Sequence, residues 1–373
     1  MNLQKVSDRL GITQERLERL QESILKRSSW PEPPLMRFEK SSSGIESGTV
    51  IFENNEIVFG YPRIRRAMIL GPTLRRHFGD RVAVEEKMNG YNIRLASVNG
   101  EVVALTRGGF ICPYSTEVAS RLLPNEVFEK NPEFVLCGEM VGPENPYVPK
   151  DIYPTDTIDF YLFDLLKKNR RSTLGIYKTH QFAEEYGIKA TAFFGEFRIE
   201  RAYEKIMGII KHLGKRNREG VVIKDPDNKL APLKYTTSET NRHDLEIAFS
   251  YYNDYAIDFF LSRTIREGFQ SVEWNESEDK RKERAKLLGE SILLPLVDTI
   301  QKKMNGEQIV QQVQIRVKSL KTAREFEYHL RRSGMRTIFE EPEPNDDGYI
   351  IKITRLIMST NDKTQSLLEG EPW

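Results

Sequence analysis

A lysine beside a glycine turn has the clearest chemical potential in this sequence. Lys87 stands three residues before Gly90, between two apolar segments with the alternation of β-strands. A lysine amine attacks only after losing its proton, so it needs cationic or metal neighbours that lower its pKa. A lysine beside a tight turn between two strands is the arrangement expected of one that attacks a nucleotide α-phosphate and carries the nucleotide covalently.

The strand after this turn predicts a polar face beside the lysine. Asn92 and Arg94 alternate with Ile93 and Leu95, so the two polar side chains share one face of a strand. A ribose-phosphate pocket requires such a polar face.

Two further segments offer groups for phosphate and sugar oxygens. Arg107 is followed by two glycines, and its fork of donors suits phosphate, although an exposed hairpin loop has the same pattern. Glu139 lies inside an apolar strand, where an unpaired carboxylate is costly to bury. It either meets a cation, a metal or a ribose hydroxyl, or it faces water from a one-sided sheet.

An aromatic strand, 160–165, follows Glu139. Such a strand is typical of a core, but a purine also needs a flat apolar partner, and stacking contributes about 1–3 kcal/mol per base. Phe163 is the expected stacking partner, with Tyr161 on the same strand face as the second choice.

Two lysines and a glutamate complete the candidate site. Glu219 and Lys224 flank one apolar run and Lys234 ends the next, a pattern that two ordinary strands also give. Both lysines on one phosphate would stabilise its developing charge and lower the pKa of Lys87 by repulsion. Glu219 and Lys224 have opposite parity on a regular strand, so Glu219 must precede the straight part or Lys224 must end it.

These residues need a scaffold of short strands with a few helices. Residues 66–240 alternate strands, turns and helices, which predicts an α+β domain. We expect an N-terminal module over 1–65 that opens with a helix at 4–27, a helical region over 241–307, and a small separate α/β module over 308–373. The helical region has more apolar surface than a helical pair hides, so it forms a subunit interface or packs back on the parent domain.

Composition sets outer limits. The 373 residues predict two to four domains, and no stretch reaches the roughly 20 apolar residues of a membrane span. Cys112 and Cys137 suggest neither disulfides nor zinc, so we expect a cytoplasmic protein. Lys and Arg (56) nearly balance Asp and Glu (55), so nucleic-acid binding would need local basic patches.

In this order, over residues 82–235, the motifs resemble those of the covalent nucleotidyltransferase superfamily of ligases and capping enzymes. Asn92 stands where DNA ligases and capping enzymes commonly have arginine, which looks more like RNA ligases. With the aromatic and basic segment 59–66 and the helical tail, the chain resembles the homodimeric archaeal ATP-dependent RNA ligases. That resemblance implies an antiparallel-sheet, ATP-grasp-like nucleotidyltransferase core with a helical dimerisation region.

The resemblance also implies the chemistry. Lys87 would attack ATP to give lysyl-AMP and pyrophosphate, AMP would pass to an RNA 5′-phosphate, and a 3′-hydroxyl would then displace AMP. Glu85 would lie near the adenine and Phe163 would stack on it. The ribose and the neighbouring phosphate would be held by Asn92, Arg94, Arg107 and Glu139.

For the phosphates and the metal, the resemblance implies a further set. Lys224 and Lys234 would grip the α-phosphate, while Glu219 and Glu139 would organise Mg²⁺ or Mn²⁺. Two alternatives stay open, a DNA ligase or capping-type enzyme and an inactive RNA-binding relative. No five-strand OB-fold pattern follows Tyr235, which argues against the first. The joint presence of these charged residues argues against the second.

Overall fold

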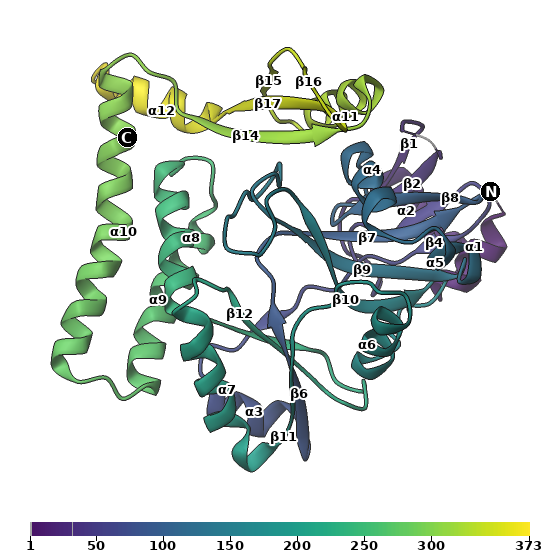
Figure 1. The fold of residues 1–373 in the computed structure, drawn as a ribbon, viewed down its shortest axis with the longest axis horizontal. Coiled ribbons are helices and arrows are strands. Elements are labelled where there is room, and N and C mark those ends of the chain that lie inside the picture. Colours follow the sequence, from purple (N-terminus) through teal and green to yellow (C-terminus); the bar gives the residue numbers. More distant parts are fainter. Residues whose placement is uncertain (1, 32) are drawn as a thin grey trace.

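The computed structural model describes residues 2–31 and 33–373 and combines helices with largely antiparallel sheets (Figure 1), which confirms the predicted α+β class. In this part of the chain, no helix has the length and apolar character that a membrane crossing requires.

The N-terminal module begins with two helices rather than the single helix expected over 4–27. Gly11 adopts a left-handed conformation (φ 65°) that ends the first helix, and the Thr13 side chain caps the second. A small sheet in the order β1-β2-β3-β4 packs against them. The elements are α1 (Leu3–Leu10), α2 (Gln14–Ser23), β1 (Leu25–Ser28), β2 (Leu35–Phe38), β3 (Val50–Phe52) and β4 (Ile57–Val58).

The first sheet of the central domain has the order β11-β6-β12-β13-β5. Alternate residues such as Val82, Val84, Val221 and Ile223 are buried in one core with the helices α3 and α7, so the other face of these strands is free to carry polar groups. The elements are β5 (Arg65–Arg66), α3 (Leu70–His77), β6 (Arg81–Lys87), β11 (Phe193–Arg198), α7 (Ile199–Gly214), β12 (Gly220–Lys224) and β13 (Leu233–Thr236).

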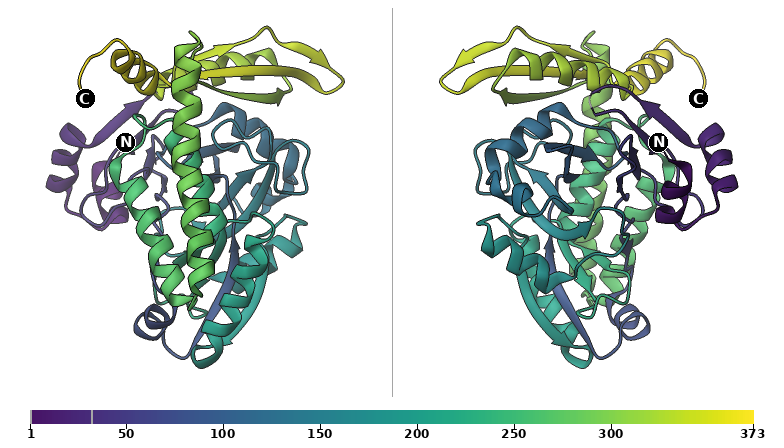
Figure 2. Two further views of the ribbon diagram at one scale, coloured as in Figure 1. Left: turned by 90° about the vertical axis from the view of Figure 1, so that its left-hand side faces the viewer. Right: turned by 90° about the vertical axis from the view of Figure 1, so that its right-hand side faces the viewer.

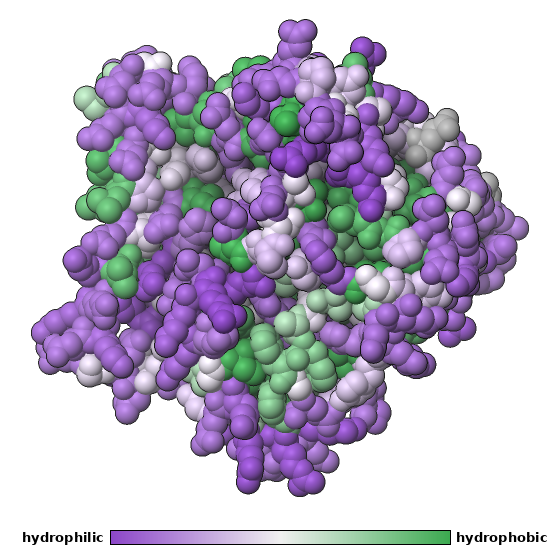
Figure 3. All heavy atoms as spheres, in the orientation of Figure 1, coloured by the Kyte–Doolittle hydropathy of each residue, from purple (hydrophilic) through white to green (hydrophobic). Residues whose placement is uncertain are grey.

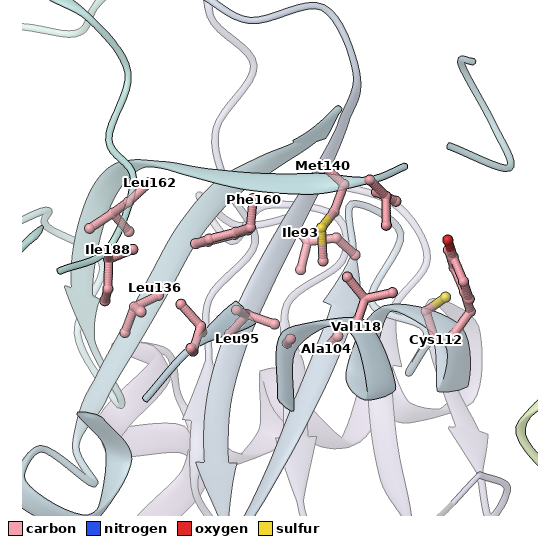
Figure 4. Close-up of a cluster of buried hydrophobic side chains, with 14 of the residues drawn as sticks. Ile93, Leu95, Ala104, Cys112, Val118, Leu136, Met140, Phe160, Leu162 and Ile188 are labelled. Carbon is pink, nitrogen blue, oxygen red and sulfur yellow. The ribbon is translucent and has the colours of Figure 1, made fainter. Parts of the chain in front are cut away.

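The second sheet has the order β10-β9-β7-β8. One face buries Ile93, Leu95, Leu136 and Phe160 in the cluster drawn in Figure 4. The opposite face packs on the N-terminal sheet. The elements are β7 (Tyr91–Val98), β8 (Glu101–Thr106), α4 (Pro113–Leu122), α5 (Glu126–Lys130), β9 (Phe134–Val141), β10 (Asp159–Lys167) and α6 (Ile176–Glu185).

Three helices follow the central domain. They are α8 (Ser238–Ser250), α9 (Ile257–Glu273) and α10 (Glu278–Met304). Of the three, α10 lies outermost, as Figure 2 shows from the side. These helices occupy the region 241–307 that was expected to be helical, and the first begins three residues before it.

The C-terminal module folds over the second sheet (Figure 1) rather than standing apart as we expected. Phe326 and Ile351 belong to the same buried cluster as Ile93, and the rings of Phe326 and Tyr114 have centroids 5.2 Å apart. The C-terminal module and the central domain therefore share one hydrophobic core. Its elements are β14 (Val310–Val317), α11 (Leu320–Arg332), β15 (Thr337–Phe339), β16 (Glu343–Asn345), β17 (Gly348–Leu356) and α12 (Met358–Leu368).

Candidate active site

A cleft of about 1090 Å³ opens beside the turn that joins β6 to β7. Both central sheets contribute to its walls, and its outer end is lined by the helical region and the C-terminal module. Nine of the predicted site residues line it, namely Glu85, Lys87, Asn92, Arg107, Glu139, Phe163, Glu219, Lys224 and Lys234.

Strand register brings the charged residues of the first sheet together. Glu85 and Lys87 lie on the face of β6 opposite to its buried valines. Val222 of β12 pairs with both Glu85 and Lys234, so Lys234 lies two strands away at the same level. The period of two along three strands thus places these side chains on the cleft side.

Lys87 is held in a salt bridge. Its Nζ lies 2.8 Å from Glu219 Oε2 and also donates to the backbone oxygen of Met88 at 3.3 Å. Burial lowers the pKa of Lys87, but the charges of Glu219 and Glu139 outweigh burial and raise it. The expectation that neighbouring lysines lower this pKa is therefore wrong for the unliganded protein.

Glu219 reaches this position because it precedes the strand. Gly220 begins β12 with φ 145°, a backbone conformation that side chains rarely adopt, and a Cβ atom there would lie 2.3 Å from the backbone oxygen of Tyr235. Lys224 is the last residue of β12. This arrangement removes the difficulty of opposite parity.

Lys224 lies against carboxylates. Its Nζ lies 2.6 Å from Glu85 Oε2 and 3.1 Å from Asp164 Oδ1, and it donates to the Phe163 backbone oxygen at 2.7 Å. These charges outweigh burial and raise the pKa of Lys224. In this state Lys224 compensates buried carboxylates, so its positive charge is already matched.

Lys234 behaves in the opposite way. Burial first, and then repulsion from Lys87, lowers its pKa to about 8. Lys87 and Lys234 repel each other, and because Glu219 compensates the charge of Lys87, it is the pKa of Lys234 that this repulsion leaves lowered. A bound phosphate would relieve it.

Glu139 and Asn92 face the cleft from adjacent strands, where they are paired in register. Burial raises the pKa of Glu139 to about 7, and its Oε1 accepts from the Gly90 N–H at 3.3 Å. The Asn92 Oδ1 atom is buried and has no hydrogen-bond partner among the residues that the structure describes. A ribose hydroxyl would satisfy it.

The carboxylates suit a metal that also binds phosphate. Among the described residues, no group of three or more His, Cys, Asp or Glu side chains could hold a metal ion. The charge of Glu219 acts on the pKa of Glu139, and the charges of both carboxylates act on the pKa of Lys87, so these three groups lie close together. Two carboxylates fit Mg²⁺ or Mn²⁺ that takes its other oxygen ligands from phosphate and water.

Arg94 is not among the described residues that line the cleft, which contradicts its predicted ligand role. It is fully buried and donates to the backbone oxygens of Phe59, Gly48 and Thr106 at 2.7, 2.9 and 2.8 Å. Arg94 shares a strand face with Asn92, but loops of the N-terminal module cover that part of the face. Its role is to join these loops to β7.

Two residues outside the motifs, His180 and Thr191, join the candidate site in the folded chain. His180 Nε2 lies 2.7 Å from Glu85 Oε1, and Tyr61 donates to the Asp164 carboxylate. Thr191 lines the cleft, is 2% exposed, and has an Oγ1 atom with no hydrogen-bond partner among the described residues. His180 and Thr191 lie outside the motifs, so only the fold brings them to the site.

The sequence matches two protein-family models. The model described as RNA ligase matches residues 80–236, and the model described as the C-terminal region of ligase Pab1020 matches residues 247–371. An uncharacterized protein of Methanocaldococcus jannaschii, MJ0414, is 38% identical over 383 residues, which cover 100% of this chain and 97% of that protein.

Solved structures of ligases are also similar to this chain. One described as an archaeal ATP-dependent RNA ligase is 39% identical, covers 100% of both chains and superimposes with a TM-score of 0.94. A proposed ATP-dependent DNA ligase from Aquifex aeolicus is 25% identical, covers 97% of this chain and 100% of that one, and has a TM-score of 0.91. The nucleotidyltransferase fold expected from the motifs is thus confirmed. The chain belongs to the RNA ligase family that includes the archaeal ATP-dependent RNA ligase.

Proposed function

We propose that this chain joins RNA 5′-phosphate and 3′-hydroxyl ends with ATP, through AMP bonded covalently to Lys87. The proposal rests mainly on the position of Lys87 in the cleft. The Lys87 amine forms a salt bridge with Glu219, and it is repelled by the charge of Lys234, two strands away. Its family membership supports the ATP-dependent RNA ligase activity.

In the first step, Lys87 loses its proton and attacks the α-phosphorus of ATP, and pyrophosphate leaves. Glu219 Oε2, 2.8 Å from the amine, is the acceptor placed to take that proton. Lys234 carries an unrelieved charge and would stabilise the negative charge on the phosphate oxygens.

Glu139 and Glu219 would hold Mg²⁺ or Mn²⁺, which would neutralise phosphate charge. Glu139 is half-buried and its pKa is raised to about 7, so a nearby cation favours its charged form.

The adenine would occupy the deep end of the cleft. Phe163 lines this end, and its position is fixed by an edge contact with Tyr61 at 5.1 Å between ring centroids. Glu85 would accept from the adenine amino group, and the unpartnered Thr191 hydroxyl would bind a ring nitrogen. Asn92 and Arg107 line the cleft nearer Lys87 and would hold the ribose and a phosphate.

In the remaining steps, the RNA 5′-phosphate attacks the AMP phosphorus and releases the Lys87 amine. The 3′-hydroxyl then attacks the activated 5′-phosphate and AMP leaves. The same cations serve every step, because each attack occurs at a phosphate beside Lys87.

We also propose a homodimer formed through α9 and α10. Exposed apolar residues recur at helical spacing on both helices, at Ile257, Leu261, Ile265 and Phe269 and at Leu293, Val297, Ile300 and Met304. In Figure 3, hydrophobic atoms are exposed along the edge that α10 occupies in Figure 1. Such a surface is typical of a subunit interface.

The dimer is tested by light scattering after size-exclusion chromatography. The double variant Leu261→Asp with Leu293→Asp should elute as a monomer. Leu230→Asp, which changes an exposed leucine away from these helices, should stay dimeric. A monomeric wild-type protein would refute the proposal.

The activity is tested with single-stranded RNA that carries a 5′-phosphate and a 3′-hydroxyl. Wild-type protein with ATP and Mg²⁺ should produce joined or circular RNA, and Lys87→Ala should produce none. Lys321→Ala, at an exposed lysine of α11, is the matched control and should act as wild type. DNA of the same sequence separates RNA from DNA ligation, and preferred joining of DNA would contradict the proposal.

A further inference from the structure

We propose that the outer half of the cleft binds the single-stranded RNA end that carries the 5′-phosphate. Its terminal bases would stack on Tyr251 and Tyr255, and its phosphates would bind Lys150 and Arg355. This assignment rests on the proposed ligase function and adds the place and the chemistry of RNA recognition.

The cleft is large for one small ligand. Its volume of about 1090 Å³ exceeds the range of roughly 300–1000 Å³ that is typical of a pocket for one small ligand. The adenosine-binding residues lie at the deep end, on the two central sheets. The outer end is built by different elements, namely the loop from β9 to β10, which carries Lys150, the connection from α8 to α9, and the C-terminal module. A second ligand therefore has room beyond Lys87.

Aromatic rings line this outer end. Tyr251, Tyr255 and Phe259 all face the cleft and are half-buried rather than packed in a core. The Tyr255 and Phe259 rings have centroids 4.8 Å apart, and the Arg263 guanidinium covers Phe259 at 3.3 Å from its centroid. This packing fixes the direction of Tyr255. Partly exposed, fixed aromatic rings are the usual stacking platform for unpaired bases.

Two cations that line the cleft form no salt bridge within the described part of the chain. Lys150 is 9% exposed and lines the cleft, and within the described residues neither it nor Arg355 forms a salt bridge. Burial lowers the pKa of Lys150 and outweighs the charges of Asp244, Glu219 and Glu246, which raise it. Arg355 lies near both tyrosines, since its charge acts on the pKa of each. A buried amine without a partner is costly, so an anionic ligand explains its place.

The chemistry assigns this end to the strand with the 5′-phosphate. Phosphoryl transfer proceeds with the attacking and leaving groups roughly in line. Pyrophosphate therefore leaves from the side opposite Lys87, and the RNA 5′-phosphate must then approach from that same side. The deep end is filled by adenosine, so this approach comes from the outer end, where Lys150 and Arg355 lie.

Fluorescence anisotropy with a short 5′-phosphorylated single-stranded RNA tests the site on the adenylated protein. Tyr251→Leu with Tyr255→Leu should raise the RNA Kd at least tenfold, because each lost stacking partner weakens binding severalfold or more. Tyr251→Phe with Tyr255→Phe keeps the rings and should bind as wild type. Tyr177→Leu, at an exposed tyrosine of α6, controls for loss of any surface ring.

Lys150→Met tests the phosphate contact. It should weaken binding of 5′-phosphorylated RNA about tenfold, and binding of the same RNA with a 5′-hydroxyl far less. Lys321→Met, at an exposed lysine, is the matched control. Equal losses for both RNAs would overturn the assignment to the 5′-phosphate strand.

AMP transfer from ATP to the protein needs no RNA and separates the two proposals. Failure of the wild type to form the AMP adduct would refute the ligase mechanism. An intact adduct in the double leucine variant, with an unchanged RNA Kd, would overturn the outer-cleft site alone. Loss of the adduct in that variant, with the phenylalanine variant normal, would also overturn it, since the rings would then serve ATP rather than RNA.

Discussion

Replacing Lys234 with methionine should stabilise the unliganded protein while it disables the enzyme. The Lys234 amine is partly buried and is repelled by Lys87, and no salt bridge of Lys234 is formed among the described residues. Methionine keeps most of the apolar stem and removes the charge. The same charge is what we expect the α-phosphate to need.

The size of the effect follows from the pKa. The difference between the ordinary value of 10.5 and about 8 corresponds to about 3 kcal/mol of folding free energy at neutral pH. Lys234 retains contact with solvent, so we expect a gain of about 1–2 kcal/mol. Loss of a group that stabilises transition-state charge should reduce adenylation by about 10²–10³-fold.

The effect of Lys234 on stability should depend on pH. Below pH 8, Lys234 is charged in both the folded and the unfolded states, so the full penalty is present. As the pH rises from about 8 to 10.5, the folded state loses this proton first and the penalty disappears. The stability advantage of Lys234→Met should therefore be constant below pH 8 and vanish by about pH 10.5.

Denaturant unfolding at pH 7 and pH 10, together with the adenylation rate, tests this prediction. Lys224→Met is the matched control because its effect on stability has the opposite sign. It leaves Glu85 and Asp164 buried without their cation and should cost roughly 3–5 kcal/mol. A Lys234→Met protein that is less stable than wild type at pH 7 would refute the reasoning.

Three further predictions concern residues that the structure reassigned or added. Arg94→Met should destabilise the protein by about 3 kcal/mol or more in urea unfolding, because three backbone oxygens lose their donor, while calorimetry of the folded variant should give a nearly normal ATP affinity. Thr191→Val should leave the unfolding free energy unchanged, because its Oγ1 has no partner, but should raise the ATP Kd about tenfold. Gly90→Ala should abolish adenylation and lower the melting temperature, because its Cβ would lie 2.0 Å from the Met140 backbone oxygen. A normal melting temperature for Gly90→Ala, a lost ATP affinity for folded Arg94→Met, or an unchanged ATP Kd for Thr191→Val would contradict these roles.

Much of the site follows from strand periodicity. A period of two puts Glu85 and Lys87 on one face of β6, and the strand register of the folded sheet brings Lys234 to the same side. The same rule put Arg94 beside Asn92 correctly. It could not predict that loops 35 and 46 residues earlier in the chain cover Arg94 and accept its hydrogen bonds.

Electrostatics was harder to predict than position. Repulsion between lysines was expected to lower the pKa of Lys87, but Glu219, 132 residues away, pairs with Lys87 and raises that pKa, so that Lys234 has the lowered pKa instead. The distribution of charge depends on which carboxylate reaches which amine, and strand patterns do not contain that information. His180 and Thr191 were missed for a related reason, since single residues outside any motif become visible only when the chain is folded.

Mass spectrometry of peptides from protein incubated with ATP and Mg²⁺ tests the central claim most directly. One AMP should be found on the peptide that contains Lys87, bonded to that side chain, and it should disappear when 5′-phosphorylated RNA is added. AMP on another residue, or ligation by a protein that never carries AMP, would contradict the role assigned to Lys87.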